Sequence, residues 1–413
     1  MTVQAPRAPL KALDDALAEL LAQVQPIVRV EQVSTFDADG RALAEDVIAA
    51  LQVPPHDNSS MDGYALRSAD VTQAGTELPL TQRIAAGAIG HDLQPGSVAR
   101  IFTGAPIPGG VDAVVMQEDC ELVGGDGGVV RVKTVPVPGQ WIRRAGEDVT
   151  HGTVVLAKGM RLGPAGLGLA ASVGRASLSV ALRPKVALFS TGDELVMPGE
   201  VAPEAMKPGA IYNSNRFFLR ALLQRLGCAV TDFGIVPDRR DATLEALRNA
   251  ARDHDLILTS GGVSVGEEDH IKPAVQALGE LKLWQIAMKP GKPFAYGKVA
   301  STHFIGLPGN PVSSFVTFLL LVRPFLLRLQ GVHDVALPSS MVPAHFNWPK
   351  ADKRREFLRV RRNSAGGLDL FSNQSSGVLT SAVWGDGLVD TPPGQTIAHG
   401  DKVAFIAFSD LLS

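Results

Sequence analysis

The sequence is poor in the residues that mark several classes of protein. It has only two cysteines, Cys120 and Cys228, which leaves no disulfide framework or cysteine metal site and fits a reducing cytoplasm. Its formal net charge of −3 gives no global basic field to attract nucleic acid or an anionic membrane. Its nine histidines show no pair at zinc-binding spacing. Any site for an anion must therefore be built locally.

Long apolar runs are also scarce. The N-terminus lacks the apolar segment of a secretory signal. The most apolar run, 315–322, is too short to span a bilayer before Arg323 and Pro324. These absences predict a cytoplasmic protein with no membrane partner.

The composition and sequence pattern divide the chain into several parts. Its 413 residues exceed one ordinary core, so two to four domains are expected. The leucine-rich stretch 10–24 has helical spacing and predicts an amphipathic docking helix. Residues after Lys185 alternate between strand and helix patterns, which predicts a doubly wound sheet. The fold class expected is multidomain α/β, with a central α/β domain (1–30 plus 184–335), a small connecting domain (31–48 plus 153–183), an inserted β-rich domain (49–152) and a C-terminal β-barrel-like domain (336–413).

Polar loops follow the strands of the predicted α/β domain. In an open α/β sheet, ligands bind beyond the carboxyl ends of the strands. Lys289 and Lys292 add two cations on a turn, and Asn310 followed by Pro311 predicts the start of a helix. The loops that leave strand ends are Ser190–Glu194, Pro237–Asp238, Ser260–Asp269 and Gly306–Pro311.

The loop after the strand Asp255–Ser260 is the centre of this pattern. Gly261 and Gly262 let backbone N–H groups approach a ligand, and a helix predicted over Ile271–Leu278 adds unpaired donors, so the loop suits a phosphate. Carboxylates beside a phosphate need a hard cation, so Mg²⁺ is the expected cofactor. The reaction favoured is Mg²⁺-assisted cleavage of a phosphate or pyrophosphate bond. Any one of these acids is as often a solvated or helix-capping residue as a metal ligand. The prediction therefore rests on the convergence of Asp193, Glu194, Asp238 and Asp269.

A serine hydrolase is a competing interpretation of the same loop. Gly262–Gly266 matches the G-x-S-x-G pattern with Ser264 as the nucleophile. Such an elbow exposes its serine on a tight turn directly after the strand. Here Ser260, Gly261 and Gly262 lengthen the loop and three acids follow, which disfavours this interpretation.

Seven motifs together carry a resemblance to a known family. The chain resembles the MoeA family of molybdopterin molybdenumtransferases, related to gephyrin and plant E domains, and the motifs follow the family's order along nearly the whole chain. They are Asp57–Ala65 (DNSSMDGYA), Ile101–Pro106 (IFTGAP), Gly146–Asp148 (GED), Ser190–Glu194 (STGDE), Ser260–Gly266 (SGGVSVG), Lys289–Pro293 (KPGKP) and Leu307–Pro311 (LPGNP).

The resemblance implies a molybdenum insertase of molybdenum cofactor biosynthesis. Such an enzyme takes adenylyl-molybdopterin and molybdate, cleaves the pyrophosphate link with Mg²⁺, releases AMP and leaves molybdenum on the dithiolene. The resemblance also implies a homodimer in which the central domain has the MogA fold. The partner subunit's β-rich domain would close over the cleft, and the molybdopterin adenylyltransferase is a further candidate partner.

The family's functional residues carry over to matching positions in this sequence. The implied catalytic residues are Asp62, Thr103, Asp148, Glu194, Asp238 and Asp269, of which Glu194, Asp238 and Asp269 would bind the metal. The implied contacts to the pterin nucleotide are Asp57, Ser190, Thr191, Gly192, Ser260, Gly261, Gly262, Ser264, Pro308, Gly309 and Asn310. The implied contacts to molybdate are Lys289, Lys292, Ser313, Arg359 and Ser376.

Two departures and two alternatives accompany the resemblance. His270 stands where an aromatic residue usually follows the aspartate, and Ser375 replaces a glycine often found before Ser376. A molybdopterin adenylyltransferase is an alternative because the central domain alone resembles that fold, although the other domains argue against it. A non-catalytic gephyrin-like scaffold would need an eroded site, whereas all the polar site positions are present. Molybdate and tungstate are not distinguished.

Overall fold

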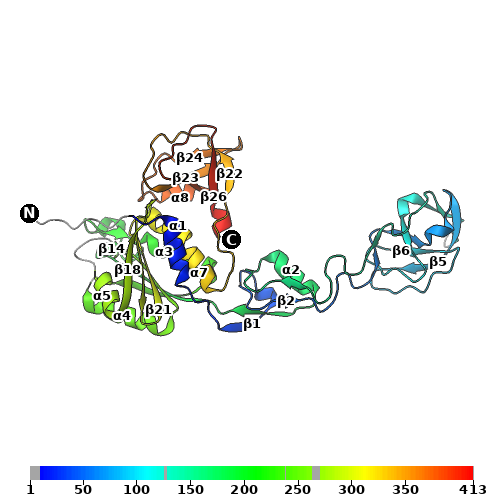
Figure 1. The fold of residues 1–413 in the computed structure, drawn as a ribbon, viewed down its shortest axis with the longest axis horizontal. Coiled ribbons are helices and arrows are strands. Elements are labelled where there is room, and N and C mark those ends of the chain that lie inside the picture. Colours follow the sequence, from blue (N-terminus) through cyan, green and yellow to red (C-terminus); the bar gives the residue numbers. More distant parts are fainter. Residues whose placement is uncertain (1–9, 125–127, 238, 263–269, 413) are drawn as a thin grey trace, which may run out of the picture.

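The structure, a computed structural model, describes residues 10–124, 128–237, 239–262 and 270–412. Figure 1 shows an elongated molecule in which an α/β body and a C-terminal β unit lie at one end and a separate β-rich lobe lies at the other. A smaller unit that contains β1, β2 and α2 joins them. Each unit has its own cluster of buried apolar side chains.

The α/β body is built on a mixed six-stranded sheet with the order β16-β13-β17-β21-β20-β18. β16, β13, β17 and β21 pair in parallel, β20 pairs antiparallel with β21, and β18 pairs antiparallel with β20. Because the parallel strands share a direction, their carboxyl ends and the loops that follow meet at one edge. The strands are β13 (Lys185–Thr191), β16 (Ala229–Val236), β17 (Leu256–Ser260), β18 (Gly279–Gln285), β20 (Pro293–Val299) and β21 (Thr302–Leu307).

Helices cover both faces of this sheet. One apolar core contains Leu20, Leu223 and Phe325 from α1, α3 and α7, and a second contains Leu247 and Val275 from α4 and α5. The helices are α1 (Leu13–Ala22), α3 (Ser214–Arg225), α4 (Arg240–Asp253), α5 (Ile271–Leu278), α6 (Pro311–Thr317) and α7 (Arg323–Leu329), with a π-helical segment (Phe318–Val322) between the last two and a short parallel pair, β14 (Leu195–Val196) and β15 (Ile211–Tyr212), beside them.

The apolar run 315–322 lies within the long helix that the sequence predicts from Pro311, and this helical segment continues past Arg323 and Pro324. The segment Pro311–Leu329 is long and apolar enough to cross a membrane by length and composition alone, but 89% of its 18-residue apolar window is buried in the protein. Arg323 within it is also buried and donates from Nε to the Leu411 carbonyl. The segment is therefore the central core helix of the α/β body, and its apolar character is explained by burial on all sides.

The connecting unit is small and is bounded by two pairs of antiparallel strands. β1 pairs with β12, and β2 pairs with β11. Leu43, Leu162 and Val180 lie in its core. Its elements are β1 (Val30–Ser34), a 3-10 turn (Thr35–Asp37), β2 (Val47–Ile48), β11 (Val154–Leu156), α2 (Pro164–Ser172) and β12 (Ser177–Ala181).

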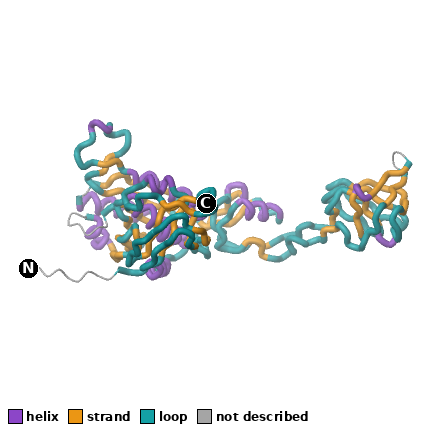
Figure 2. Tube along the Cα trace, turned by 90° about the horizontal axis from the view of Figure 1, so that it is seen from above, coloured by secondary structure: helices purple, strands orange, loops and turns teal. Residues whose placement is uncertain are grey.

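The β-rich lobe, which we call the lid, is a six-stranded sheet with the order β7-β4-β6-β5-β9-β8. A two-stranded ribbon joins the lid to the connecting unit. In this ribbon β3 pairs with β10, and Val53 bridges to Val149. Figures 1 and 2 both place the lid far from the α/β body of the same chain. The strands of its sheet are β4 (Gly63–Leu66), β5 (Thr76–Ile84), β6 (Val98–Ile101), β7 (Ala113–Met116), β8 (Cys120–Val123) and β9 (Val129–Val132), with 3-10 turns at Ser68–Asp70 and Gln117–Asp119. The ribbon strands are β3 (Asn58–Ser59) and β10 (Ile142–Arg143).

The C-terminal unit is a sheet that also takes in a strand of the α/β body. β19, which contains Lys289, pairs in parallel with β23, so the two units share one sheet. The order is β19-β23-β25-β26-β22, and β24 pairs with β23. The elements are β19 (Met288–Lys289), β22 (Ser340–Pro343), β23 (Arg355–Arg362), β24 (Leu368–Leu370), α8 (Thr380–Trp384), β25 (Gly387–Thr391), β26 (Lys402–Ala407) and α9 (Phe408–Leu412).

Candidate active site

The ends of three parallel strands form the floor of the candidate site. The N–H of Gly261 donates to the Leu307 carbonyl at 3.1 Å, which joins the loops after β17 and β21. Gly261 and Gly262 have φ angles of 92° and 67°, the left-handed region that favours glycine. A Cβ added to Gly261 would lie 2.8 Å from the Thr191 carbonyl oxygen, and one added to Gly262 would lie 3.0 Å from Thr191 Oγ1. The glycines thus allow the loop after β17 to pack against the end of β13.

A cavity of about 630 Å³ opens above this floor. Ser260, Glu194, Gly309 and Ser313, all predicted from the sequence, line it together with Gly377 of the C-terminal unit. Pro308 and Asn310 also line it, in the loop after β21 and at the start of α6. Asn310 does occupy the N-cap of α6, but its side chain makes no cap hydrogen bond. The cavity therefore gathers loops from distant parts of the chain at the carboxyl edge of the sheet.

Two asparagines at the start of α3 organise the same cavity. Asn215 Nδ2 donates to Ser260 Oγ and to the Gly309 carbonyl, both at 2.7 Å. Asn213 is the N-cap of α3, and its side chain accepts from the Arg216 N–H. The two side chains are 8% and 1% exposed, respectively. This buried polar contact fixes the spacing of two strand-end loops.

The predicted metal ligands are only partly described. Glu194 is exposed and lines the cavity, and a Cβ on Gly192 would lie 2.4 Å from its Oε2. Gly192 therefore leaves the space into which this carboxylate folds. Asp238, Asp269 and the loop residue Ser264 lie outside the described residues. Within the part of the chain that the structure describes, no group of three or more His, Cys, Asp or Glu side chains could hold a metal ion.

Mg²⁺ fits the chemistry of the donors that are described. Hard cations prefer oxygen ligands, and the cavity presents the Glu194 carboxylate beside the Ser260 hydroxyl. Ser190 and Thr191 at the end of β13 are buried, and their hydroxyl oxygens have no hydrogen-bond partner among the described residues. These groups leave unused oxygen at the edge where a phosphate and its cation would lie.

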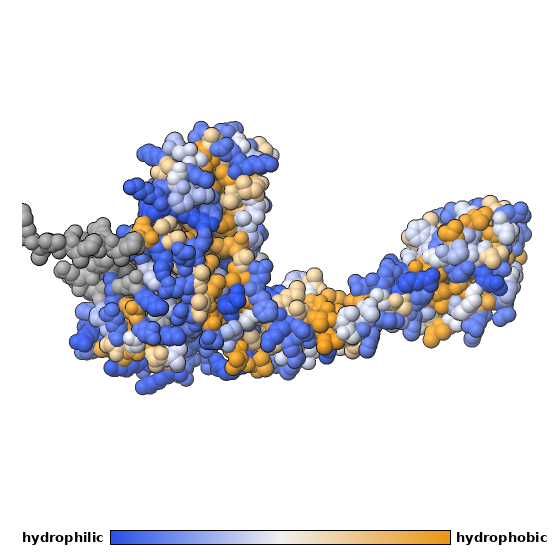
Figure 3. Space-filling model, in the orientation of Figure 1, coloured by the Kyte–Doolittle hydropathy of each residue, from blue (hydrophilic) through white to orange (hydrophobic). Residues whose placement is uncertain are grey.

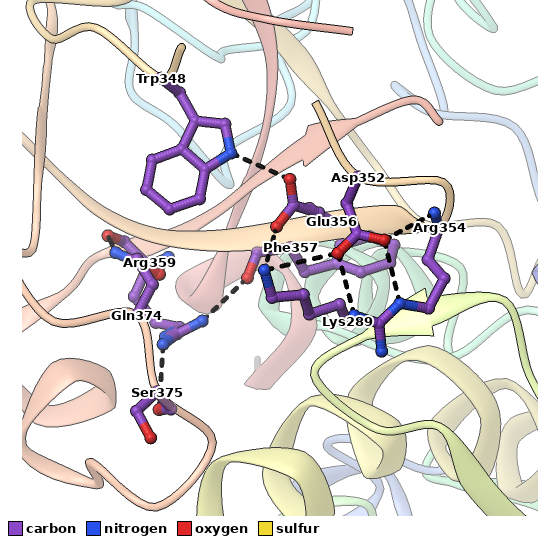
Figure 4. Close-up of polar contacts among 9 residues, drawn as sticks. All are labelled: Lys289, Trp348, Asp352, Arg354, Glu356, Phe357, Arg359, Gln374 and Ser375. Atoms are coloured by element: carbon purple, nitrogen blue, oxygen red, sulfur yellow. Dashed lines mark hydrogen bonds and ion pairs between the residues drawn. The ribbon is translucent and has the colours of Figure 1, made fainter. Parts of the chain in front are cut away.

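Arg359 is a buried positive charge whose side chain contacts the loop that contains Ser375 (Figure 4). Its side chain is 1% exposed and donates to Ser381 Oγ at 3.1 Å, the Phe357 carbonyl at 3.1 Å and the Ser375 carbonyl at 3.2 Å. Burial lowers the pKa of Arg359 to about 10, and no carboxylate among the described residues forms an ion pair with it. A buried guanidinium without a counter-charge is a site of positive potential that an anion would neutralise.

The loop that holds Ser376 reaches the start of α6. The Val312 N–H donates to the Ser376 carbonyl at 2.9 Å, and Ser313, which is 5% exposed, lines the cavity beside it. The Arg359 N–H also donates to Gln374 Oε1, which ties the same loop to β23. The structure thus brings Arg359, the Ser376 loop and Ser313 into one region.

Lys289 is engaged by carboxylates in this structure (Figure 4). Its Nζ lies 2.8 Å from Glu356 Oε1 and 3.5 Å from Asp352 Oδ2. The Glu356 side chain is buried and also accepts from Trp348 Nε1 at 2.9 Å, and hydrogen bonds from Arg354 are the main cause of the lowered pKa of Asp352. The sequence prediction of an anion-binding Lys289 did not include these two acids. Lys292 on the same turn is half-buried.

The site residues predicted outside the α/β body lie at two places, the lid and its ribbon. Thr103 donates to Asp62 Oδ1 through both its backbone N–H and its hydroxyl, each at 2.8 Å, and these bonds lower the pKa of Asp62. Asp148 is exposed at the ribbon, where its N–H donates to the Val53 carbonyl. Asp57 accepts from the Ala145 N–H at 2.8 Å and also pairs with Arg144, which together lower its pKa. Its carboxylate therefore closes the ribbon, which is the loop-forming role that an aspartate at this position offers as the alternative to substrate binding.

Three family models together match most of the chain. Residues 11–174 match the MoeA N-terminal region (domain I and II), residues 187–328 match a probable molybdopterin binding domain, and residues 341–408 match the MoeA C-terminal region (domain IV). The chain is 42% identical over 348 residues to the molybdopterin molybdenumtransferase of Haemophilus influenzae, covering 84% of this chain and 85% of that protein. The chain belongs to the MoeA family.

Other MoeA relatives span the chain in the same way. The molybdopterin molybdenumtransferase 2 of Mycobacterium tuberculosis is 38% identical over 392 residues, 91% of this chain and 93% of that protein. A crystal structure of the molybdopterin biosynthesis moeA protein from Pyrococcus horikoshii matches with a TM-score of 0.84 at 28% identity, covering 97% of this chain and all of that chain. The gephyrin of Dictyostelium discoideum is 34% identical over 358 residues, which cover 49% of that protein.

Sequence reasoning missed three side chains of this MoeA chain. Asn213 and Asn215 follow the short strand β15 in the run Tyr212-Asn-Ser-Asn215, and an Asn directly before a helical pattern is a cap signal. Glu356 lies between Arg355 and Phe357 in a strand that mixes arginines with apolar residues, and a buried acid requires a partner. Its partner, Lys289, lies 67 residues away, so only the fold pairs them.

Proposed function

We propose that this chain is a molybdenum insertase that cleaves adenylyl-molybdopterin, inserts molybdate into the dithiolene and releases AMP. The observation that carries the proposal is one cavity lined by the end of β17, the start of α6 and the C-terminal loop that also contacts Arg359. The MoeA relatives named as molybdenumtransferases support it. We therefore assign the pterin nucleotide to the glycine-loop side of the cavity and molybdate to the Arg359 side.

The molybdate side rests on charge and donors. Arg359 supplies a buried cation, and Ser313 and the Ser376 loop supply hydroxyl and N–H groups beside it. A tetrahedral dianion would accept from these donors and remove the cost of the isolated charge. Lys289 would contribute when its pairing with Glu356 relaxes, and Lys292 lies on the same turn.

The nucleotide side rests on the loops after β13, β17 and β21. Glu194, together with Asp238 and Asp269, would hold Mg²⁺ near the phosphates of the substrate, where the cation would stabilise negative charge. Gly261, Gly262 and Gly309 let the backbone approach the nucleotide, and Asn215 holds Ser260 and the Gly309 loop together. These residues orient the scissile bond, which is a large part of catalysis by proximity.

A homodimer would complete the site. Asp62, Thr103 and Asp148 belong to the lid and its ribbon, which lie far from the α/β body of their own chain in Figures 1 and 2. The connecting unit has an apolar cavity of about 720 Å³, lined by Phe36, Leu167, Ala171 and neighbouring residues, and Phe36 is 97% exposed. Figure 3 shows apolar side chains gathered on this unit. A second copy of the chain that covers this surface would bring its own lid toward the cleft.

The activity is tested with purified protein, adenylyl-molybdopterin, molybdate and Mg²⁺. AMP release that requires molybdate supports the insertase. ATP-dependent adenylylation of free molybdopterin would instead make the chain an adenylyltransferase, and neither activity would favour a scaffold. Tungstate in place of molybdate tests the choice of oxyanion. Mixing the protein with a molybdopterin adenylyltransferase tests whether substrate passes directly between the two proteins.

The dimeric site is tested by complementation. Asp62→Asn and Glu194→Gln should each abolish turnover alone. If the lid acts on the partner's cleft, mixing the two variants in equal amounts restores about a quarter of wild-type activity, because half of the dimers are mixed and each has one intact site. No restoration after verified subunit exchange would place both halves of the site in one chain.

A further inference from the structure

Asn213 has a hydrogen-bond donor that the fold leaves unused. The residue is 1% exposed and lines the cavity of the candidate active site. Its N–H donates to the Val196 carbonyl at 2.9 Å, and its Oδ1 accepts from the Arg216 N–H at 3.2 Å. Its Nδ2 has no hydrogen-bond partner among the described residues. A buried amide donor without a partner is costly unless a ligand or a water satisfies it.

The hydrogen bonds of the Asn213 N–H and Oδ1 hold its unpaired Nδ2 in place. The Val196 contact fixes the backbone at the end of the β14–β15 pair, and the cap contact fixes the side-chain rotamer at the start of α3. Neither contact needs Nδ2, so the cap alone does not explain why the residue is an asparagine. Ser and Asp cap helices about as well as Asn.

We propose that Asn213 is a substrate-binding residue whose Nδ2 donates to an oxygen acceptor of the bound nucleotide. The inference rests on the proposed function and adds a contact that neither the motifs nor the comparisons assign. The cavity already places Glu194, Ser260 and Gly309 around the same space. The first turn of α3 carries backbone N–H groups without intrahelical partners, which favours an acceptor with negative charge. A phosphate oxygen fits this environment, and the carbonyl of the pterin is the other source of the same chemistry.

Two variants separate the ligand role from the cap role. Asn213→Ser keeps a capping oxygen and shortens the side chain, so its hydroxyl cannot replace Nδ2 at the same point. Asn213→Asp keeps the cap and the shape but replaces the donor with a charged acceptor. Asn347→Asp is the matched control, because Asn347 is exposed in the C-terminal unit and its Oδ1 accepts from the His399 N–H, a role that Asp also fills.

The measurements are KM and kcat for AMP release, the affinity for AMP by calorimetry and the thermal unfolding midpoint. We expect Asn213→Ser to raise KM about 5- to 10-fold with kcat and unfolding nearly unchanged, which is the loss of one hydrogen bond. Asn213→Asp should lose more than Asn213→Ser if the acceptor is a phosphate, and the affinity for AMP should fall in parallel. Equal losses with unchanged AMP affinity would assign the donor to the pterin carbonyl. Asn347→Asp should behave as wild type.

Two results would overturn the inference. One is a wild-type KM and AMP affinity in both Asn213 variants, which would leave the residue as a cap only. The other is a wild-type protein that binds neither AMP nor adenylyl-molybdopterin at millimolar concentration. Failure of AMP release alone would refute the insertase proposal but not the binding role, because calorimetry measures affinity without turnover.

Discussion

Replacement of Arg359 by Met should separate the anion-binding role of this side chain from its structural role. The guanidinium is 1% exposed, and burial lowers its pKa to about 10. That fall corresponds to about 3 kcal/mol of unfavourable free energy for keeping the charge in place. Met has similar length and no charge, so it removes this cost while it loses the hydrogen bonds to Ser381 and Ser375. The free energy of unfolding should therefore change little.

The affinity for molybdate should change much more. Hydrogen bonds that involve a charged group contribute about 1.5 to 3 kcal/mol each, so Arg359→Met should bind molybdate about 10- to 100-fold more weakly. Arg359→Lys should recover only part of the loss, because an ammonium lacks the planar fork of the guanidinium. Isothermal calorimetry with sodium molybdate, at constant ionic strength, measures both variants.

Arg361→Met is the matched control for this experiment. Arg361 lies on the same strand, β23, but is exposed and packs over the Trp384 ring at 4.5 Å. Its loss removes one positive charge from the same unit without touching the cavity. Molybdate affinity that is unchanged in Arg359→Met, or equally reduced in both variants, would refute the reasoning that the buried, unpaired charge is the anion site.

Three further predictions follow from other contacts. Glu356→Gln removes the charge that pairs with Lys289 at 2.8 Å, so molybdate affinity by calorimetry should rise about 3- to 10-fold; a weaker affinity would show that Glu356 is needed to position Lys289. Gly262→Ala would place a Cβ 2.8 Å from Ile271 Cγ1 at a φ of 67°, so this variant should lose most AMP release. The control is Gly87→Ala, where φ is 82° and no atom lies near the added Cβ. It should lose only about 1 to 2 kcal/mol of stability in urea unfolding. Burial lowers the pKa of His303 from 6.5 to about 4, so as the pH falls the unfolded state binds the proton first. The contribution of His303 to the free energy of unfolding should therefore be constant above pH 6.5 and fall by about 3 kcal/mol toward pH 4. Unfolding of His303→Gln should depend less on pH over this range.

The sequence allowed prediction of features that depend on local pattern. Alternation of strand and helix after Lys185 predicts the sheet, and Gly261 and Gly262 predict that the strand ends before them, as β17 does at Ser260. The start of the long core helix at Pro311 was also predicted, but its end was not. Arg323 and Pro324 look like stop signals in sequence, but Pro324 is tolerated after a π-helical segment and Arg323 finds a carbonyl partner at Leu411.

Features of the site that depend on contacts across the chain could not be predicted. Lys289 and Arg359 look alike as cations in sequence, yet one faces Glu356 and the other faces only neutral groups. That difference decides which of them carries an unneutralised charge. The unused donor of Asn213 likewise depends on the pairing of β14 with β15, which positions its backbone beside Val196.

The separation of the lid from the cavity has a physical consequence for the reaction. Asp62 is already satisfied by Thr103 on the lid surface, and Glu194 is exposed at the edge of the sheet. Carboxylates brought together from two such surfaces repel each other unless a cation and phosphates lie between them. If the lid acts at the cleft as proposed, we expect it to approach only when Mg²⁺ and the nucleotide lie between these carboxylates.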